Sequence, residues 1–435
     1  MRLLVRGGRV VDPSQGLDAV ADLLIEDGVV ARIGEGLAEP SGGGEGGAEV
    51  IDAAGLVVCP GLIDLHVHLR EPGQEYKETV RTGTMAAAAG GFTAVCSMPN
   101  TDPVNDNRAV TEHIVSQARR HGFARVYPVG AVSKGMRGEE LSEVGDLVEA
   151  GAVAISDDGL PVANAELMRR VLLYARHFGI PVVQHAEDLA LTGAGVMHEG
   201  EWSTRLGLPG IPGSSEDVVV ARDLLLAEDT GGRYHVAHLT TARSLELVRR
   251  AKARGLTVSC EATPHHLLLT DREVAERGFS TDAKMKPPLR AESDREALLA
   301  GLADGTVDAI ASDHAPHHAD EKDVEFSAAP FGIIGLETTL SLCLDRLVQP
   351  GVIGLSRLVE LLSTGPARAF NLPGGTLAPG SPADLTLFHL DREVTVDPAS
   401  FRSKSRNTPF GGLKLRGAPV ETILGGRRVE LPPQR

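Results

Sequence analysis

Eight short apolar runs, separated by segments with helical character, constrain the fold of this chain more than any other feature. The runs occupy residues 62–69, 92–98, 125–132, 152–156, 180–186, 234–239, 256–262 and 307–313. Amphipathic segments lie between most of them, and strands that alternate with helices predict a parallel sheet with helical crossovers. Eight repeats favour an α/β fold of the (β/α)8 TIM-barrel type. In a doubly wound open sheet, the main alternative, a glycine-rich GxGxxG turn would follow one of the runs, and none does.

The two ends of the chain have a different pattern. Residues 1–56 and 371–435 carry short strand-like stretches broken by glycine and Asp-Gly turns. We expect these two segments to pair into one small composite β-sandwich domain and residues 57–370 to form the barrel. The glycine-rich stretch 41–49 is expected to be a loop without a phosphate-binding context.

Composition and charge exclude several classes of protein. A formal net charge of −16 argues against nucleic acid and membrane surfaces as partners. The sequence has no apolar run of the ~18 residues that a membrane span needs, and the apolar stretch at the N-terminus is too short for a signal peptide. The cysteines form no CxxC pair and are expected to be buried free thiols: Cys59, Cys96, Cys260 and Cys343. These features indicate a cytoplasmic protein.

Ionisable residues close five of the eight apolar runs. They are, in chain order, His66 and His68, Asp157 and Asp158, His185, His238, and Asp313. Because the carboxyl ends of barrel strands converge on one mouth, these side chains are expected to meet there. Burying them without partners would be costly, so we interpret the set as a metal site.

The residue types in this set suit hydrolysis assisted by two metal ions. His66 and His68 lie two residues apart on a strand, so both rings face the same side. Zinc binds histidine nitrogen and carboxylate oxygen and keeps a position open for water in catalytic sites. Six ligands exceed the needs of one tetrahedral ion, and two ions that share a carboxylate would use them all. From the residues alone, Asp157 and Asp158 are both candidates for that shared carboxylate.

The same residues resemble the metal-ligand pattern of the amidohydrolase superfamily, and longer stretches resemble the bacterial class I dihydroorotases. These stretches are PGLIDLHVHLREPG, VCSMPNTDP, SDDG, CEATPHHLLLT, KPPLR, SDHAPH and PFGIIGLET. The resemblance runs over essentially the whole chain and implies a centre of two zinc ions (Zn2+) per subunit. It assigns the metal ligands as His66 and His68 for one ion, His185 and His238 for the other, Asp158 as the bridge, and Asp313. Many superfamily members bridge with a carboxylated lysine, and no lysine lies near the end of the fourth run here.

The resemblance also implies a reaction. It is the reversible hydrolysis of (S)-dihydroorotate to N-carbamoyl-L-aspartate in pyrimidine biosynthesis. A metal-bound hydroxide would be the nucleophile and Asp313 the catalytic general acid and base. The implied substrate contacts are His68, Arg70, Asn100, His317, Phe331 and Gly332, and the Arg70 guanidinium can bind the substrate carboxylate in bidentate fashion.

The sequence departs from the family pattern at one position and leaves other functions open. Lys286 stands where some class I members have an asparagine that contacts the substrate ring. His265 and His266 are expected to belong to a structural loop rather than to the site.

Dihydropyrimidinases, hydantoinases and allantoinases share the metal pattern, but their usual substrates have no carboxylate for Arg70. A metal-free structural partner of aspartate carbamoyltransferase is a further alternative, although here every ligand position is filled. Assembly into a homo-oligomer, or into a complex with that transferase, stays open.

Overall fold

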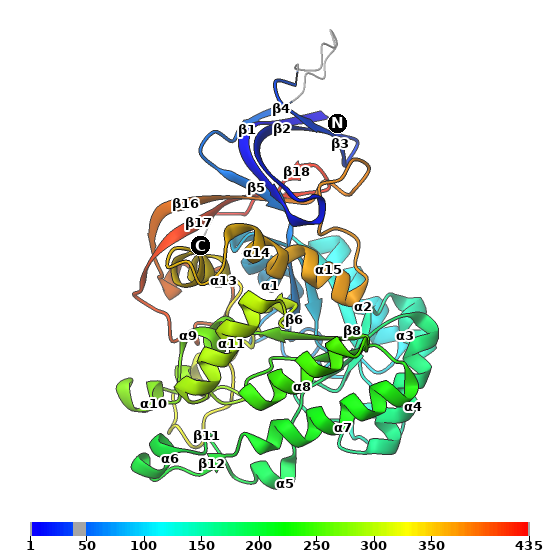
Figure 1. Ribbon diagram of the computed structural model, residues 1–435, viewed down its shortest axis with the longest axis vertical. Coiled ribbons are helices and arrows are strands. Elements are labelled where there is room, and N and C mark those ends of the chain that lie inside the picture. Colours follow the sequence, from blue (N-terminus) through cyan, green and yellow to red (C-terminus); the bar gives the residue numbers. More distant parts are fainter. Residues whose placement is uncertain (1, 38–48, 434–435) are drawn as a thin grey trace.

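The computed structural model describes residues 2–37 and 49–433, with a β-sheet at one end of the long axis and a barrel at the other (Figure 1). Residues 1, 38–48 and 434–435 lie outside the described part. They include most of the loop predicted at 41–49 and the outermost residues of the two proposed terminal segments.

Eight parallel strands form the barrel in the order in which they occur along the chain. They are β6 (Leu62–Val67), β7 (Phe92–Ser97), β8 (Arg125–Gly130), β9 (Ala154–Ser156), β10 (Val182–Gln184), β13 (Tyr234–Val236), β14 (Val258–Ala262) and β15 (Ala309–Ile310). The first and last strands meet beyond their ends, where Val67 and His314 form a parallel bridge. The His68 N–H donates to the His314 carbonyl at 2.9 Å, so the barrel closes and the predicted fold class is confirmed.

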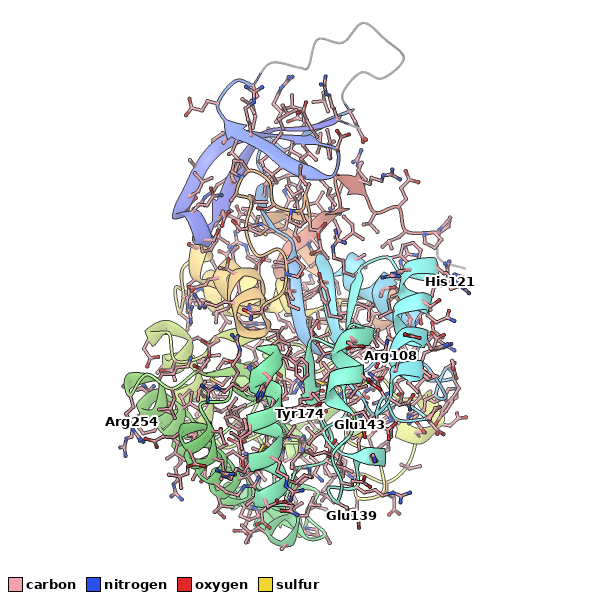
Figure 2. All side chains as sticks on the ribbon, turned by 90° about the vertical axis from the view of Figure 1, so that its right-hand side faces the viewer. Arg108, His121, Glu139, Glu143, Tyr174 and Arg254 are labelled. Atoms are coloured by element: carbon pink, nitrogen blue, oxygen red, sulfur yellow. The ribbon has the colours of Figure 1, made fainter. Side chains whose placement is uncertain are left out.

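The helices lie outside the barrel strands, where Figure 2 shows Arg108, His121 and Tyr174 at the surface. The longer helices are α1 (Val80–Ala89), α2 (Arg108–His121), α3 (Val144–Ala150), α4 (Ala165–Phe178), α7 (Ser214–Thr230), α8 (Ala242–Ala253) and α11 (Glu292–Asp304). The shorter elements are α5 (Leu189–Thr192), β11 (Met197–His198), α6 (Glu201–Leu206), β12 (Gly210–Ile211), α9 (Pro264–Leu268), α10 (Glu273–Glu276), α12 (Ala319–Lys322), α13 (Thr339–Cys343), α14 (Leu355–Val359) and α15 (Gly365–Phe370). Several helices begin at a side chain that accepts a main-chain N–H, as Asn107 does for α2 and Asn164 for α4. Within residues 2–37 and 49–433, none of the helices combines the length and the apolar character needed to cross a bilayer.

The side chains of the barrel strands alternate between two hydrophobic clusters, as a period of two requires. In β7, Val95 packs in a cluster that includes residues of the surrounding helices. Ala94 and Cys96 belong to a second cluster formed mainly by strand residues. The cysteines are buried and free, as expected: Cys59, Cys96, Cys260 and Cys343.

Strands from both ends of the chain form one mixed sheet next to the barrel (Figure 1). They are β1 (Arg2–Asp12), β2 (Leu17–Glu26), β3 (Val29–Gly34), β4 (Glu49–Asp52), β5 (Val57–Pro60), β16 (Leu385–Thr395), β17 (Lys414–Leu424) and β18 (Arg427–Arg428). β5 pairs with β1 on one side and with β16 on the other, which joins the N-terminal to the C-terminal strands. β5 thus belongs to this sheet, although its residues fall within the range 57–370 that we expected to form the barrel.

A buried carboxylate connects the mixed sheet to the barrel. Asp384, just before β16, accepts hydrogen bonds from Arg125 at the start of β8, with Nε–Oδ2 and Nη2–Oδ1 distances of 2.6 and 3.0 Å. The Gly425 N–H also donates to Oδ1 at 2.7 Å. A bidentate pair of this kind fixes orientation as well as distance, so Asp384 sets how the two sheets meet.

We expect Asp384→Ala to lower the free energy of unfolding by about 1–2 kcal/mol, measured by urea denaturation. The Gly425 N–H would lose its acceptor, while the partly exposed Arg125 would be rehydrated and contribute less. The matched control is Asp391→Ala, which removes a solvent-exposed pair with Arg416 at 3.1 Å. This control should change stability little, and equal losses in the two variants would contradict a role for Asp384 in joining the sheets.

Candidate metal centre and active site

The ionisable residues that close the barrel strands meet at the carboxyl end of the barrel. His66 lies in β6 and His68 directly after it, whereas Asp158, His185, His238 and Asp313 follow β9, β10, β13 and β15 within three residues. All six side chains are buried. The structure therefore brings together the six side chains that the family resemblance assigned as metal ligands.

Asp158 lies between two pairs of histidines. Its Oδ2 is 3.2 Å from His66 Nε2 and 3.5 Å from His68 Nε2. Its Oδ1 is 3.4 Å from His185 Nδ1 and 3.3 Å from His238 Nε2. Each carboxylate oxygen thus faces one pair.

Asp157, the other aspartate at the end of this strand, points elsewhere. It accepts the Ser133 N–H at 3.0 Å and the Ser133 hydroxyl at 2.5 Å. Asp157 therefore braces the segment that follows β8, and of the two adjacent aspartates it is Asp158 that faces the histidines.

Asp313 lies beside the first histidine pair. Its Oδ1 is 3.2 Å from His68 Nε2 and 3.6 Å from His66 Nε2. Burial alone would raise the pKa of Asp313, but the neighbouring His66 and His68 outweigh it and lower the pKa below the usual range of aspartate. The carboxylate is therefore ionised and able to accept a proton.

Three residues of the site have a left-handed backbone, with φ values of 63° at Arg70, 31° at His238 and 45° at Asp313. Residues other than glycine rarely adopt this conformation, because the Cβ atom crowds the backbone. Such residues cluster at functional sites, where the surrounding structure holds them in place. No sequence pattern indicated this backbone conformation in advance.

The donor atoms of the cluster fit a metal site. The described part of the chain has three groups of three residues whose possible ligand atoms all lie within 4.8 Å of one another within the group. The groups are His66, His238 and Asp313; His66, His68 and Asp158; and Asp158, His185 and His238. Across the described residues, His66 Nε2 and His238 Nδ1 find no hydrogen-bond partner although both atoms are buried. Unpartnered buried nitrogens are costly, and histidine nitrogen with carboxylate oxygen is a donor set that zinc prefers.

Two acidic residues that we did not single out in the sequence also touch the histidines. Glu187 Oε2 lies 3.2 Å from His185 Nε2, and Glu261 Oε1 lies 2.7 Å from His66 Nδ1. Glu261 is a carboxylate inside the otherwise apolar β14, and that unusual placement is the signal that could have revealed it. Glu187 follows His185 by two residues and carries no comparable signal.

A cavity of about 350 Å3 opens beside the metal ligands. Its lining includes the six substrate contacts that the family resemblance implied: His68, Arg70, Asn100, His317, Phe331 and Gly332. Asn100 Oδ1 is 2.8 Å from His68 Nδ1. His317 Nε2 is 2.9 Å from the Phe331 carbonyl, and a side chain at Gly332 would place a Cβ atom 2.8 Å from the His317 ring. The close approach of the Gly332 main chain to the cavity wall therefore requires a glycine.

Arg70 is a buried cation on this wall. Its Nε donates to the Pro316 carbonyl at 3.2 Å, and no carboxylate in the described part of the chain lies within 4.0 Å of its guanidinium nitrogens. Burial lowers the pKa of Arg70 to about 10, which leaves it charged at neutral pH. An unpaired charge that is both buried and next to a cavity points to an anionic ligand.

Lys286 also lines the cavity and is paired with an acidic residue. Its Nζ lies 3.0 Å from Glu187 Oε2 and 5.5 Å from the centre of the Phe331 ring. Glu187 in turn contacts His185, so the lysine that departs from the family pattern is linked to the metal cluster through one carboxylate.

His265 and His266 lie in helix α9, not in the loop that we expected from the sequence, and His266 is held by contacts on both ring nitrogens. Its Nδ1 lies 2.7 Å from Thr263 Oγ1 and its Nε2 lies 2.9 Å from the Pro287 carbonyl. The neighbouring His265 is also buried, and burial lowers its pKa to about 4, so this ring is neutral.

Comparison with known proteins gives a consistent result. A family model described as dihydro-orotase-like matches residues 55–244. Curated dihydroorotases from Anaeromyxobacter sp. (strain K) and Geobacter metallireducens are 58% and 55% identical to this chain; the alignments cover 98% and 99% of this chain and 97% and 99% of theirs. Among solved structures, the L-hydantoinase (dihydropyrimidinase) of Arthrobacter aurescens is similar with a TM-score of 0.87 at 27% identity, covering 98% of this chain and 95% of its own.

The two kinds of likeness carry different weight. A fold shared with a hydantoinase at 27% identity is compatible with several cyclic-amide substrates. Identity of 58% across nearly the whole of both chains is much more specific, and it accompanies buried histidine and aspartate clusters that fit a metal site. The chain therefore belongs to the dihydroorotase family of the amidohydrolase superfamily and is a cyclic-amide hydrolase.

Proposed function

We propose that the protein catalyses the reversible hydrolysis of (S)-dihydroorotate to N-carbamoyl-L-aspartate, a step of pyrimidine biosynthesis. The observation that carries this proposal is the buried Arg70, which has no carboxylate partner among the described residues and lines the same cavity as the histidine cluster. Dihydroorotate combines a cyclic amide bond with a ring carboxylate, so it would present its reactive bond to the cluster and its negative charge to Arg70. An uncharged ring such as hydantoin would leave Arg70 without a partner.

The proposed centre holds two zinc ions. His66 and His68 would hold one ion and His185 and His238 the other, and Asp158, whose two oxygens each face one of these pairs, would be shared between them. When bound, the ions lower the pKa of the attacking water and polarise the amide carbonyl. Glu187 and Asn100 contact the far nitrogens of His185 and His68 and orient the two rings.

Asp313 is the proposed general acid and base. It is ionised, buried and beside the first histidine pair, so it can accept a proton from the attacking water. As the ring C–N bond breaks, it would return that proton to the leaving nitrogen. Ring closure follows the same steps in reverse, with the proton moving from nitrogen to Asp313.

The carboxylate of the substrate would be held by Arg70, Asn100 and His317. The planar guanidinium of Arg70 matches a carboxylate with two parallel hydrogen bonds. Asn100 uses its Oδ1 on His68, which leaves its amide N–H groups for the cavity. The main chain of Phe331 and Gly332 completes this wall and would contact the ring.

The direct test of the reaction is ring opening by the zinc-loaded chain, measured with L-dihydroorotate beside dihydrouracil, hydantoin and allantoin. We expect turnover of dihydroorotate alone, and we expect it to disappear when zinc is removed and to return when zinc is restored. Turnover of an uncharged ring instead would overturn the proposed substrate. Binding of zinc without turnover of any ring would favour a structural partner over an enzyme.

Asp313→Asn should lower kcat by about 10²–10⁴-fold, because it removes the proton acceptor and preserves the shape of the side chain. We expect the variant to retain most of its zinc, measured by metal analysis of the purified protein. The matched control is Asp157→Asn, which makes the same change in a buried aspartate that contacts Ser133. Near-normal kcat in Asp313→Asn would contradict its proposed role.

Arg70→Gln should raise KM for dihydroorotate by about 10–100-fold, since a hydrogen bond to a charged group contributes about 1.5–3 kcal/mol. The reaction at the ring should be less affected, so kcat should fall by a smaller factor. Steady-state kinetics separate the two effects, and Arg254→Gln, on the exposed end of α8, serves as the control. An unchanged KM would show that the carboxylate is bound elsewhere.

A further inference from the structure

Glu261, in β14, is a fully buried carboxylate with three donors around it. Its Oε1 lies 2.7 Å from His66 Nδ1 and accepts the main-chain N–H of His238 at 3.3 Å. Its Oε2 lies 3.1 Å from His235 Nε2. The contacts continue from His235 Nδ1 to Ser259 Oγ at 2.7 Å. One carboxylate thus serves residues of β6 and of the segment around β13.

These contacts cross the inside of the barrel. β14 has β13 and β15 as its neighbours, and β15 lies between β14 and β6. Glu261 therefore reaches His66 past an intervening strand, which a side chain can do only through the barrel interior. The contact is not a by-product of strand pairing, and it places a negative charge directly behind the metal-ligand cluster.

The chemistry of the contact determines which nitrogen of His66 carries a proton. An ionised carboxylate only accepts hydrogen bonds, so His66 Nδ1 must donate to it. The other ring nitrogen, Nε2, then keeps its lone pair, and this atom faces Asp158 and Asp313. A carboxylate that accepts the far N–H of a histidine also increases the basicity of the nitrogen that binds metal.

The same carboxylate restrains the second histidine pair through the backbone. The His238 N–H donates to Glu261, and His238 has a φ of 31°, a conformation that needs support from its surroundings. Both oxygens of Glu261 have nitrogens within hydrogen-bond distance, from His66 and His238 at Oε1 and from His235 at Oε2. The carboxylate therefore remains an acceptor for both His66 and His238.

We propose that Glu261 is a positioning residue of the metal centre, which holds His66 in the tautomer with Nε2 free to bind metal and ties His66 to His238 across the barrel. The inference rests on the metal centre of the proposed function. It assigns to β14 a role that the six ligand candidates do not include, because Glu261 acts through two histidines and lies behind them.

The test measures metal binding by the full-length chain, separately from turnover. Zinc affinity is determined by competition with a chromogenic chelator, and the visible spectrum of the cobalt-loaded protein reports ligand geometry. Glu261→Gln keeps the shape and removes the charge. We expect it to lower zinc affinity by about 10–100-fold and to shift the cobalt spectrum.

Glu216→Gln is the matched control. Glu216 is also buried and also accepts main-chain N–H groups near His238, but its hydrogen bonds are with Thr240 and Thr241. This control should lower the thermal stability of the zinc-free protein, leaving zinc affinity and the cobalt spectrum unchanged. A merely structural role for Glu261 would produce the same pattern in both variants.

An unchanged zinc affinity and cobalt spectrum in Glu261→Gln would overturn the inference. If that variant does not fold, Glu261→Asp takes its place, because it keeps the charge and withdraws it from His66. Zinc affinity equal to that of the unaltered chain would again overturn the inference. Failure of the unaltered chain to bind zinc would instead overturn the proposed metal centre, so the two failures are distinguishable.

Discussion

The contact between the ends of the first and eighth barrel strands is the constraint on which the site depends. The His68 N–H donates to the His314 carbonyl, and Val67 bridges to His314 next to it. In an open sheet with the same strand order, these strands would lie at opposite edges. Closure instead brings Asp313 Oδ1 within 3.2 Å of His68 Nε2, although nearly the whole barrel sequence lies between these two residues along the chain. Fold and site are therefore consequences of the same hydrogen bonds.

The distribution of buried charge gives the cavity two chemically different sides. On one side, carboxylates and histidines alternate so that each acid is faced by ring nitrogens, as Asp158 is by four of them. On the other side, Arg70 has, among the residues that the structure describes, a carbonyl oxygen as its only hydrogen-bond acceptor. Because buried charges without partners are costly, the first side favours cations and the second an anion. A molecule that is neutral at one end and negative at the other fits this polarity.

The sequence was sufficient to predict the barrel because its strands are apolar, recur eight times and are mostly separated by amphipathic helices. The sequence also predicted that the site lies at the carboxyl ends of the barrel strands, since the ionisable residues all stand at the ends of the apolar runs. It could not choose between Asp157 and Asp158, because adjacent residues at a strand end differ only in the direction of their side chains, and that direction depends on Ser133 in the segment after β8. The family resemblance chose Asp158, and the geometry favours the same residue. The catalytic and binding roles of the site residues remain predictions.

Other features depend on contacts between distant segments that no local pattern reveals. The apolar run at β5 has the composition of a barrel strand, and only its pairing with β1 and β16 places it in the mixed sheet. Glu261 was missed because its importance comes from His66, which lies on a strand that is not its neighbour. The division of the chain at residues 56 and 370 likewise remains a prediction.

The position of β5 has a consequence for how the chain is made. β5 is synthesised before the barrel, whereas its partner β16 leaves the ribosome only after all eight barrel strands. During that interval β5, whose residues are all buried in the finished protein, has an unpaired apolar edge. Such edges pair readily with other chains. The edge of β5 that β16 covers can therefore be paired only when translation is almost complete.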